Sequence, residues 1–341
     1  MPSQKYADIQ MGSTTNSNPL GDDVSFGGTF MYRKRIAAII ICILFINLLT
    51  GVAYLSVTSD DYFVANDKIV AINPPLDETS VTHATDRFRF LYDNYLAPND
   101  MPAFIAIVPD KGYYLQDSKK RSQLNYDALF NLTYSQMEYA TSIDLTPILN
   151  KDCYYATDSH WRQECLAPVA EHIADDMNAS DAPNADSDYE TQLATNAFTG
   201  SYQEVVSKFH IAPDSIYYLT NDELSQAVVY NYDNDSTSGL FDWVKLEDRN
   251  PYDFFLSGPS ALMHISNPAA DSNRQLIIFR DSYGSSLIPL LVPYYKEILV
   301  IDIRYTMSSH LGERIQFEDW TGADALFLYS TLLLNKSLTL K

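Results

Sequence analysis

The chain has 341 residues, of which 46% are hydrophobic and 20% are charged, so its composition is that of a globular protein with a packed core. Its formal net charge is −21. A chain this acidic with no visible basic face is not a general nucleic-acid-binding protein, because binding to phosphates needs clustered lysines and arginines.

The first 57 residues predict a membrane signal-anchor. Residues 1–32 are rich in Ser, Thr, Asn and Gly and are expected to form a disordered cytoplasmic tail. The expected anchor, 33–57, contains the uncharged stretch Ile36–Val57, which is long enough to cross a bilayer as one helix. A cleaved signal peptide is the alternative, but its apolar region would be shorter. The basic run Arg33–Arg35 precedes the stretch, so the positive-inside rule places the N-terminus in the cytoplasm and the rest of the chain outside.

The segment after the anchor predicts a linker and then the start of a folded domain. Residues 58–80 are expected to form the linker, and 81–341 the extracytoplasmic domain. Apolar residues recur at helical spacing over Thr85–Tyr95, where the threonine could cap a helix. Residues 101–110 (MPAFIAIVPD) predict a buried strand that ends in a turn.

Later apolar runs predict a mostly parallel sheet. Short continuous runs, each followed by polar or small residues, are typical of parallel strands buried on both faces of an α/β sheet. They are QLIIF at 275–279, EILVID at 297–302 and ALFLY at 325–329. Between about 181 and 253 the chain is richer in Asn, Asp, Ser and Tyr and holds two alternating segments, 215–220 and 227–232. This region predicts a small β-containing insertion with a hairpin.

Two motifs carry the residue types of nucleophilic catalysis. YYATDSHW at 154–161 holds Asp158 and His160, and FRDSYGSS at 279–286 places Ser282 directly after a predicted strand. Open α/β sheets form their sites at the carboxyl ends of parallel strands. A serine hydroxyl needs a base to remove its proton, and the base needs a third group to fix its tautomer. The three side chains could form such a site, although Asp-x-His also suits a metal site and a strand–serine–glycine turn is common.

Segments and residues near the motifs have their own expectations. A helix is predicted from about Gln163 to Met177, and a second helix near Gly284 would offer free N–H groups to a developing oxyanion. Lys111 and Asp281 are interpreted as turn residues. The remaining histidines show no metal-ligand spacing, so neither a metal nor a cofactor is predicted; they are His83, His172, His210, His264 and His310.

The two motifs resemble the paired motifs of the DHHW family, which is similar to the SGNH-like proteins of alginate O-acetylation. Further similar segments follow in the family's order, so the resemblance runs from about Met101 to the C-terminus. These segments are 107–115, 251–258, 299–305 and 325–335. The resemblance implies an SGNH-like, three-layer α/β/α fold. Ser159 departs from the family's name, which calls for His at that position.

The resemblance also implies roles for individual residues. Ser282 matches the nucleophile, His160 the general base and Asp158 the residue that orients the base. Arg304 matches a family arginine near the pocket. Substrate contacts are also considered for Tyr283 and for Trp161, although packing is the simpler interpretation of the tryptophan.

The function implied is that of a membrane-anchored O-acetyltransferase. It would act outside the cytoplasm on a cell-surface or exported polysaccharide or cell-wall polymer, beside a membrane-bound O-acyltransferase partner. A carbohydrate esterase with the same residues and water as acceptor is the alternative, and a non-catalytic glycan-binding protein is another. Retention of all three motif residues argues against the last, whereas nothing in the sequence separates the first two.

The cysteines predict one disulfide. Cys42 lies within the apolar stretch, while Cys153 and Cys165 bracket the first motif. A location outside the cytoplasm permits a bond between the latter two, which would stabilise the fold by about 3 kcal/mol and hold the loop that carries His160. The alternative is two unrelated thiols.

Overall fold

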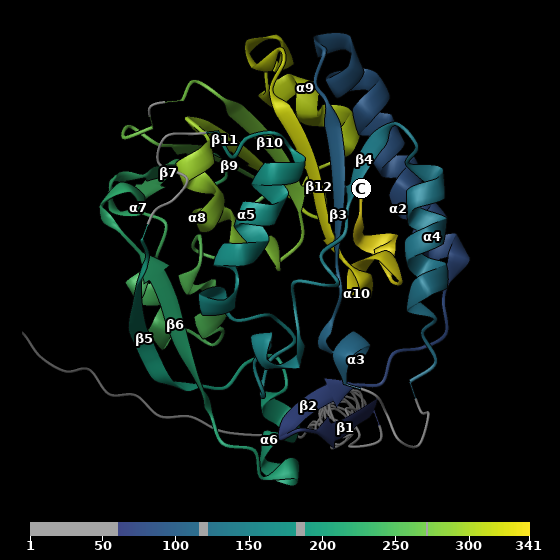
Figure 1. Cartoon of the computed structure of the whole chain (residues 1–341), viewed down its shortest axis with the longest axis vertical. Helices are drawn as coiled ribbons and strands as arrows, with labels where there is room; N and C mark the ends of the chain where they lie inside the picture. Colours follow the sequence, from purple (N-terminus) through teal and green to yellow (C-terminus); the bar gives the residue numbers. More distant parts are fainter. Residues whose placement is uncertain (1–60, 116–121, 182–187, 271) are drawn as a thin grey trace, which may run out of the picture. The chain divides into compact units, whose positions relative to one another are not determined.

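The computed structural model describes residues 61–115, 122–181, 188–270 and 272–341 (Figure 1). The chain divides into two units, and all of these residues belong to the second, Val57–Lys341. The predicted tail and anchor lie outside the described residues. Within the described ranges, no helix is both long enough and apolar enough to cross a membrane.

An eight-stranded, mostly parallel sheet forms the centre of the second unit, in the order β4-β3-β12-β10-β11-β9-β7-β8 (Figure 1). The strands from β4 to β11 are parallel neighbours, and β9, β7 and β8 add antiparallel pairs at one edge. The sheet strands are β3 Ala103–Val108, β4 Ala140–Ile143, β7 Val228–Asn231, β8 Ser236–Ser238, β9 Leu262–Ser266, β10 Gln275–Arg280, β11 Glu297–Ile301 and β12 Asp324–Ser330. The four predicted strands correspond to β3, β10, β11 and β12, so the α/β prediction is confirmed.

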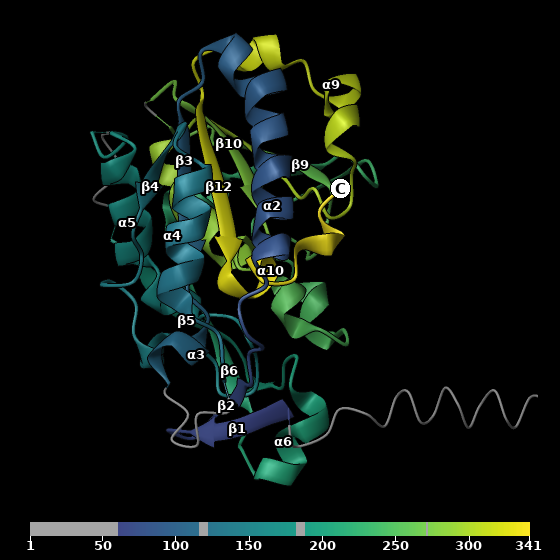
Figure 2. The same ribbon diagram turned by 90° about the vertical axis from the view of Figure 1, so that its right-hand side faces the viewer.

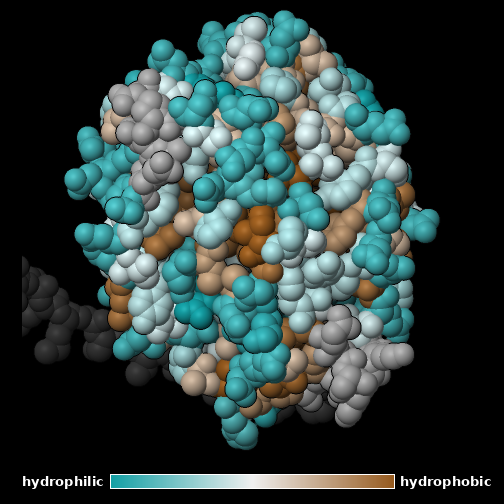
Figure 3. Space-filling view, viewed as in Figure 1, coloured by the Kyte–Doolittle hydropathy of each residue, from teal (hydrophilic) through white to brown (hydrophobic). Residues whose placement is uncertain are grey.

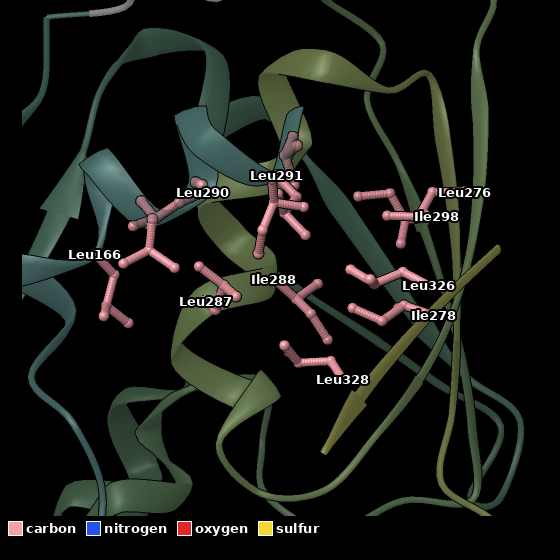
Figure 4. Packing of buried hydrophobic residues seen from close by; sticks show 14 of the residues in the cluster. Leu166, Leu276, Ile278, Leu287, Ile288, Leu290, Leu291, Ile298, Leu326 and Leu328 are labelled. Atoms are coloured by element: carbon pink, nitrogen blue, oxygen red, sulfur yellow. The ribbon is translucent and has the colours of Figure 1, made fainter. Parts of the chain in front are cut away.

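Helices cover both faces of the sheet because successive side chains of a strand point to opposite faces. Leu276 and Ile278 of β10 pack toward α5 and α8 (Figure 4). Ile277 and Phe279 pack in a second core cluster with residues of α2 and α4. These two helices lie side by side along the sheet (Figure 2). The helices are α2 Glu78–Leu91, α3 Lys111–Tyr114, α4 Tyr126–Gln136, α5 Ala167–Asp176, α6 Gln203–Phe209, α7 Asp222–Gln226, α8 Gly284–Leu291, α9 Leu311–Arg314 and α10 Thr331–Leu334. On the face seen in Figure 3, hydrophilic residues predominate and hydrophobic ones form small separate areas.

Two predicted helices begin at other residues than expected. The N-cap of α2 is Asp77, whose carboxylate accepts a hydrogen bond from the N–H of Ser80. The helix therefore begins at Glu78, well before Thr85. The Thr85 hydroxyl instead donates to the carbonyl of Val81, one turn earlier in the same helix. The helix predicted from Gln163 is a short 3₁₀ turn followed by α5, which carries a proline in its first turn.

The predicted linker contains folded structure. Its described part forms an antiparallel hairpin of β1 (Tyr62–Ala65) and β2 (Lys68–Ala71). The Lys68 ammonium donates to the carbonyl of Tyr154 at 2.6 Å, and the Ile69 N–H donates to that of Ala156 at 2.9 Å. The hairpin therefore supports the loop that carries the first motif.

The predicted insertion pairs differently from the expectation. Its alternating segments are β6 and β7, which do not pair with each other. Instead, β6 (Asp214–Thr220) pairs with β5 (Glu190–Phe198) in a separate two-stranded sheet, and β7 joins the main sheet through β9. Helix α7 separates the two segments, and alternation alone does not specify a strand's partner.

Candidate active site

Ser282 lies in the turn between the carboxyl end of β10 and the first residue of α8. Gly284 suits this turn, because an added Cβ there would lie 2.9 Å from the Cβ of Arg280. The neighbouring Asp281 is buried and accepts from the N–H of Tyr283 at 3.0 Å and from the N–H and hydroxyl of Ser330 at 2.9 and 2.6 Å. Asp281 thus joins the turn to the end of β12, as the sequence interpretation of a turn residue expects.

The first motif forms a loop that closes on itself and docks on neighbouring elements. Tyr154 and Trp161 pair as an antiparallel bridge. The Asp214 carboxylate, at the start of β6, accepts from the N–H groups of Ala156 and Thr157 at 2.9 and 2.7 Å. These bonds fix the backbone immediately before Asp158.

The structure brings the three predicted site residues together. Nε2 of His160 lies 2.8 Å from the hydroxyl of Ser282, and Nδ1 lies 2.5 Å from a carboxylate oxygen of Asp158. An ionised carboxylate only accepts hydrogen bonds, so Nδ1 carries the proton and Nε2 is free to accept the proton of the serine. The arrangement can deprotonate the hydroxyl and hold the resulting imidazolium beside a negative charge.

Asp158 is buried yet ionised. Burial alone would favour its neutral form, but His160 and the N–H groups of Ser201 and His160 outweigh burial and hold the pKa of this carboxyl well below its usual range. The Ser201 N–H donates to it at 2.6 Å. Gly200 permits this approach, since a Cβ there would lie 2.2 Å from the carboxylate oxygen. Sequence reasoning did not identify the glycine, because it lies outside both motifs.

The backbone N–H of Ser282 has no hydrogen-bond acceptor among the residues that the structure describes. The next two N–H groups donate back into the turn, that of Tyr283 to the Asp281 carboxylate and that of Gly284 to the Asp281 carbonyl. A free N–H on the nucleophile's own residue, at the beginning of α8, suits an oxyanion that develops on the attacked carbonyl.

A cleft of about 440 Å³ contains the Ser282 side chain. A second cleft of about 290 Å³ shares Ser159, Leu332 and Lys336 with the first and extends to the β1–β2 hairpin. Tyr305 lines the first cleft and is 51% exposed. The open surface near Ser282 is thus continuous with a second hollow that could receive an extended chain.

The other predicted contact residues take different positions. Arg304 lines the cleft, where its guanidinium is held by the buried Asp302 at 2.6 Å. Tyr283 also lines the cleft, and its hydroxyl donates to the carbonyl of Ser159. Trp161 is fully buried and its indole N–H donates to the carbonyl of Tyr283 at 2.9 Å. The tryptophan therefore packs the loop against α8, and the prediction that it contacts substrate is wrong.

Lys111 is a buried cation that sequence reasoning interpreted only as a turn residue. It follows β3 and donates to the carbonyls of Tyr155 and Asp158 at 2.8 and 2.7 Å. Burial lowers the pKa of its ammonium to about 7, although Asp158 and Asp214 act in the opposite direction. By donating to both carbonyls, the Lys111 side chain holds the loop segment from Tyr155 to Asp158 in place. No spacing rule signals a bond from a side chain to a distant loop carbonyl.

Replacing Lys111 with Met is expected to change the pH dependence of stability. Between about pH 7 and pH 10.4 the unfolded lysine binds more protons than the folded one, so wild type gains up to about 1.4 kcal/mol of unfolding free energy per pH unit in this window. Lys111→Met lacks this gain and leaves two carbonyls without their donor. Urea unfolding at pH 6, 8 and 10 measures the difference, with Lys151→Met, at a partly exposed lysine, as control. A difference independent of pH would contradict the assignment.

The two cysteines that bracket the loop are free thiols. They lie close enough for a hydrogen bond between Cys153 and Cys165, and this bond lowers the pKa of Cys153 to about 7. The predicted disulfide is therefore not formed in this structure, although the fold brings its partners together. Proximity alone does not form the bond, because two thiols must also lose two electrons to an oxidant.

Comparisons with known proteins match part of the chain to a family model and its fold to solved structures. A family model described as "DHHW protein" matches residues 133–301, which include both motifs but not Arg304. Among solved structures, the chain is similar to a DHHW family protein from Eubacterium siraeum, with 19% identity, a TM-score of 0.62, and coverage of 82% of this chain and 93% of that chain. No curated protein matches the sequence.

Two structures of Bacillus cereus PatB1 are also similar. One has 14% identity and a TM-score of 0.62, and covers 80% of this chain and 96% of that chain. The other, with a sulfonyl adduct, has 15% identity and a TM-score of 0.61, and covers 80% of this chain and 97% of that chain. At these identities the likeness establishes the α/β fold of the described domain.

Proposed function

Because residues 133–301 match the model of the DHHW family, we propose that the folded domain is an O-acyltransferase that uses Ser282 as nucleophile, His160 as general base and Asp158 to orient that base. The observation that carries the proposal is the continuous chain of hydrogen bonds from Asp158 through His160 to the serine hydroxyl at the cleft. The acyl group is proposed to be acetyl, as the family resemblance implies.

In the first half-reaction an acyl ester enters the cleft. The Ser282 oxygen bonds to the carbonyl carbon while Nε2 of His160 takes the hydroxyl proton, and the carbonyl electrons move to its oxygen beside the Ser282 N–H. When the carbonyl forms again, the bond to the leaving alcohol breaks and the imidazolium returns the proton to that alcohol. The product is an acyl ester on Ser282.

In the second half-reaction an acceptor hydroxyl replaces the departed alcohol. His160 removes its proton as its oxygen attacks the acyl carbon, and the serine leaves with that proton. Water in the same place gives hydrolysis, so the transferase and the esterase differ in acceptor alone. The two adjoining clefts favour an extended acceptor, such as a polysaccharide or cell-wall polymer. The exposed ring of Tyr305 offers a surface on which a sugar ring can pack.

A structure of the similar protein Bacillus cereus PatB1 contains a sulfonyl adduct, which supports the proposal that this fold can carry a nucleophile. Sulfonyl reagents form covalent bonds with activated nucleophiles, and a hydroxyl hydrogen-bonded to an imidazole is one. The fold likeness to that protein therefore agrees with a covalent route through Ser282. A non-catalytic glycan-binding protein has no need of a buried carboxylate held beside an imidazole and a serine.

The transferase and the esterase are separated by the fate of the acyl-enzyme. With p-nitrophenyl acetate, a transferase is expected to release nitrophenolate in a burst and to keep one acetyl group on Ser282, because water is a poor acceptor in its site. Added soluble polysaccharides should speed turnover and gain acetyl esters. Stopped-flow absorbance and intact-mass spectrometry measure both steps. Steady release without a burst and without any effect of polysaccharide would favour the esterase.

We propose that the domain lies outside the cytoplasm, anchored by the stretch Ile36–Val57, with a membrane-bound O-acyltransferase as donor of the acyl group. The support is the basic run Arg33–Arg35 before the stretch. A periplasmic-type reporter such as alkaline phosphatase, fused after Lys341, is expected to be active, whereas a cytoplasmic reporter at the same position should be silent. The reverse pattern would overturn both the topology and the polymer substrate.

A further inference from the structure

The imidazole of His160 contacts two tyrosine rings. The ring of Tyr252 is stacked on it with centroids 3.9 Å apart and planes at 9°. The ring of Tyr283 is tilted by 54° to the imidazole, with centroids 4.9 Å apart. Tyr252 belongs to the 3₁₀ turn Pro251–Phe254, which is remote in sequence from both motifs. Its aromatic face is therefore presented to the imidazole by the tertiary fold.

Tyr252 is held firmly as a neutral phenol. It is 2% exposed, and burial raises the pKa of its hydroxyl far above the usual range. The hydroxyl hydrogen-bonds with that of Ser286 in the first turn of α8 at 2.9 Å. The ring also meets Phe255 edge-on at 5.3 Å. One side chain thus connects the helix that begins after Ser282 with the face of His160.

We propose that Tyr252 is a positioning residue that stabilises the imidazolium form of His160 as the imidazole takes the proton of Ser282. The face of an aromatic ring carries negative electrostatic potential, so it attracts a cation within about 6 Å of its centroid. The neutral imidazole gains less from that face than the imidazolium does. The stack therefore strengthens when charge develops, and such an interaction lowers the barrier of the chemical step. This inference rests on the proposed function.

Other charged and titratable groups also face His160 and must be kept constant in a test. Asp158 contacts Nδ1, and Asp253, next to Tyr252 in the 3₁₀ turn, is close enough for its carboxylate to interact with the imidazolium. Tyr283 and Ser282 also contact the imidazole. A change confined to the electron density of the ring at position 252 alters none of these groups.

The test replaces Tyr252 with phenylalanine and with a series of fluorinated phenylalanines. Tyr252→Phe keeps an aromatic ring without fluorine, so it should keep the His160 titration of wild type. Fluorine withdraws electron density from the ring face with little change in the size of the ring. Each added fluorine should move the titration, followed by NMR of the imidazole C–H, to lower pH, by about half to one and a half units for the pentafluoro ring. The kcat with p-nitrophenyl acetate should fall in step, by roughly 2- to 30-fold, with KM unchanged.

Two results would overturn the inference, and both differ from failure of the proposed function. A titration that is the same for the whole series would show that the ring only fills space. A fall in kcat without any change in the titration would assign Tyr252 another role. Because the NMR titration needs no substrate, it tests the stack even if wild type fails to turn over the ester, and that failure would count against the acyltransferase alone. A thermal unfolding midpoint close to that of Tyr252→Phe checks that each variant is folded.

Discussion

Ser282→Ala is expected to lower acyl-ester turnover by roughly 10⁴- to 10⁶-fold while leaving the fold intact. The change removes the atom proposed to carry the acyl group. The residual activity would come from substrate binding in the cleft and from the backbone N–H at position 282. The cost to the free energy of unfolding should be about 1 kcal/mol or less, because one partly exposed hydroxyl loses one hydrogen bond. Turnover of p-nitrophenyl acetate and urea unfolding measure the two effects.

A sulfonyl fluoride provides the matched control. Wild type should gain one sulfonyl group on the peptide that contains Ser282, and Ser282→Ala should gain none. Ser135→Ala, which removes an exposed hydroxyl on α4, should react and turn over as wild type does. If Ser282→Ala retained wild-type turnover, or if the label were found on another residue, the proposed nucleophile would be wrong.

Continuous apolar runs were sufficient to predict the centre of this fold. A parallel strand buried on both faces must be apolar along its whole length, which is why the runs at 275–279, 297–302 and 325–329 could be assigned without a partner. The same logic predicted that Ser282 would lie at the carboxyl edge of the sheet. The edge strand β7 lacked such a signal, because an alternating segment is compatible with several partners.

Support from distant segments could not be predicted from spacing. Lys111 holds the loop through two main-chain carbonyls, which any residue type provides. Gly200 matters because of the close approach of one side chain from a segment 42 positions away in sequence. The β1–β2 hairpin is short, and its sequence predicts only a linker. Such contacts depend on three-dimensional proximity, whereas a motif depends on local sequence.

Asp158→Asn is expected to lower turnover by roughly 10³- to 10⁴-fold. The carboxylate now accepts from the backbone N–H and Nδ1–H of His160 on one oxygen and from the N–H of Ser201 on the other. An amide has a single acceptor oxygen. With that oxygen toward His160, the negative charge that favours the imidazolium is lost. With the amide oxygen toward Ser201, the amide NH₂ donates to Nδ1, so the imidazole proton lies on Nε2. A protonated Nε2 cannot accept the proton of the Ser282 hydroxyl.

Stability should fall in the same variant and in a pH-dependent way. In either orientation of the amide one buried N–H faces another donor, which costs about 1 to 3 kcal/mol of unfolding free energy near pH 7. The folded pKa of Asp158 lies below its unfolded value of about 3.9, so its contribution is present above that value and is lost as pH falls toward the folded pKa. The stability gap between wild type and Asp158→Asn should therefore narrow below about pH 4. The control Asp144→Asn, at an exposed residue, should differ little from wild type in unfolding free energy at every pH. A gap that stays constant from pH 7 to pH 3 would mean that Asp158 is not the ionised, hydrogen-bonded partner of His160.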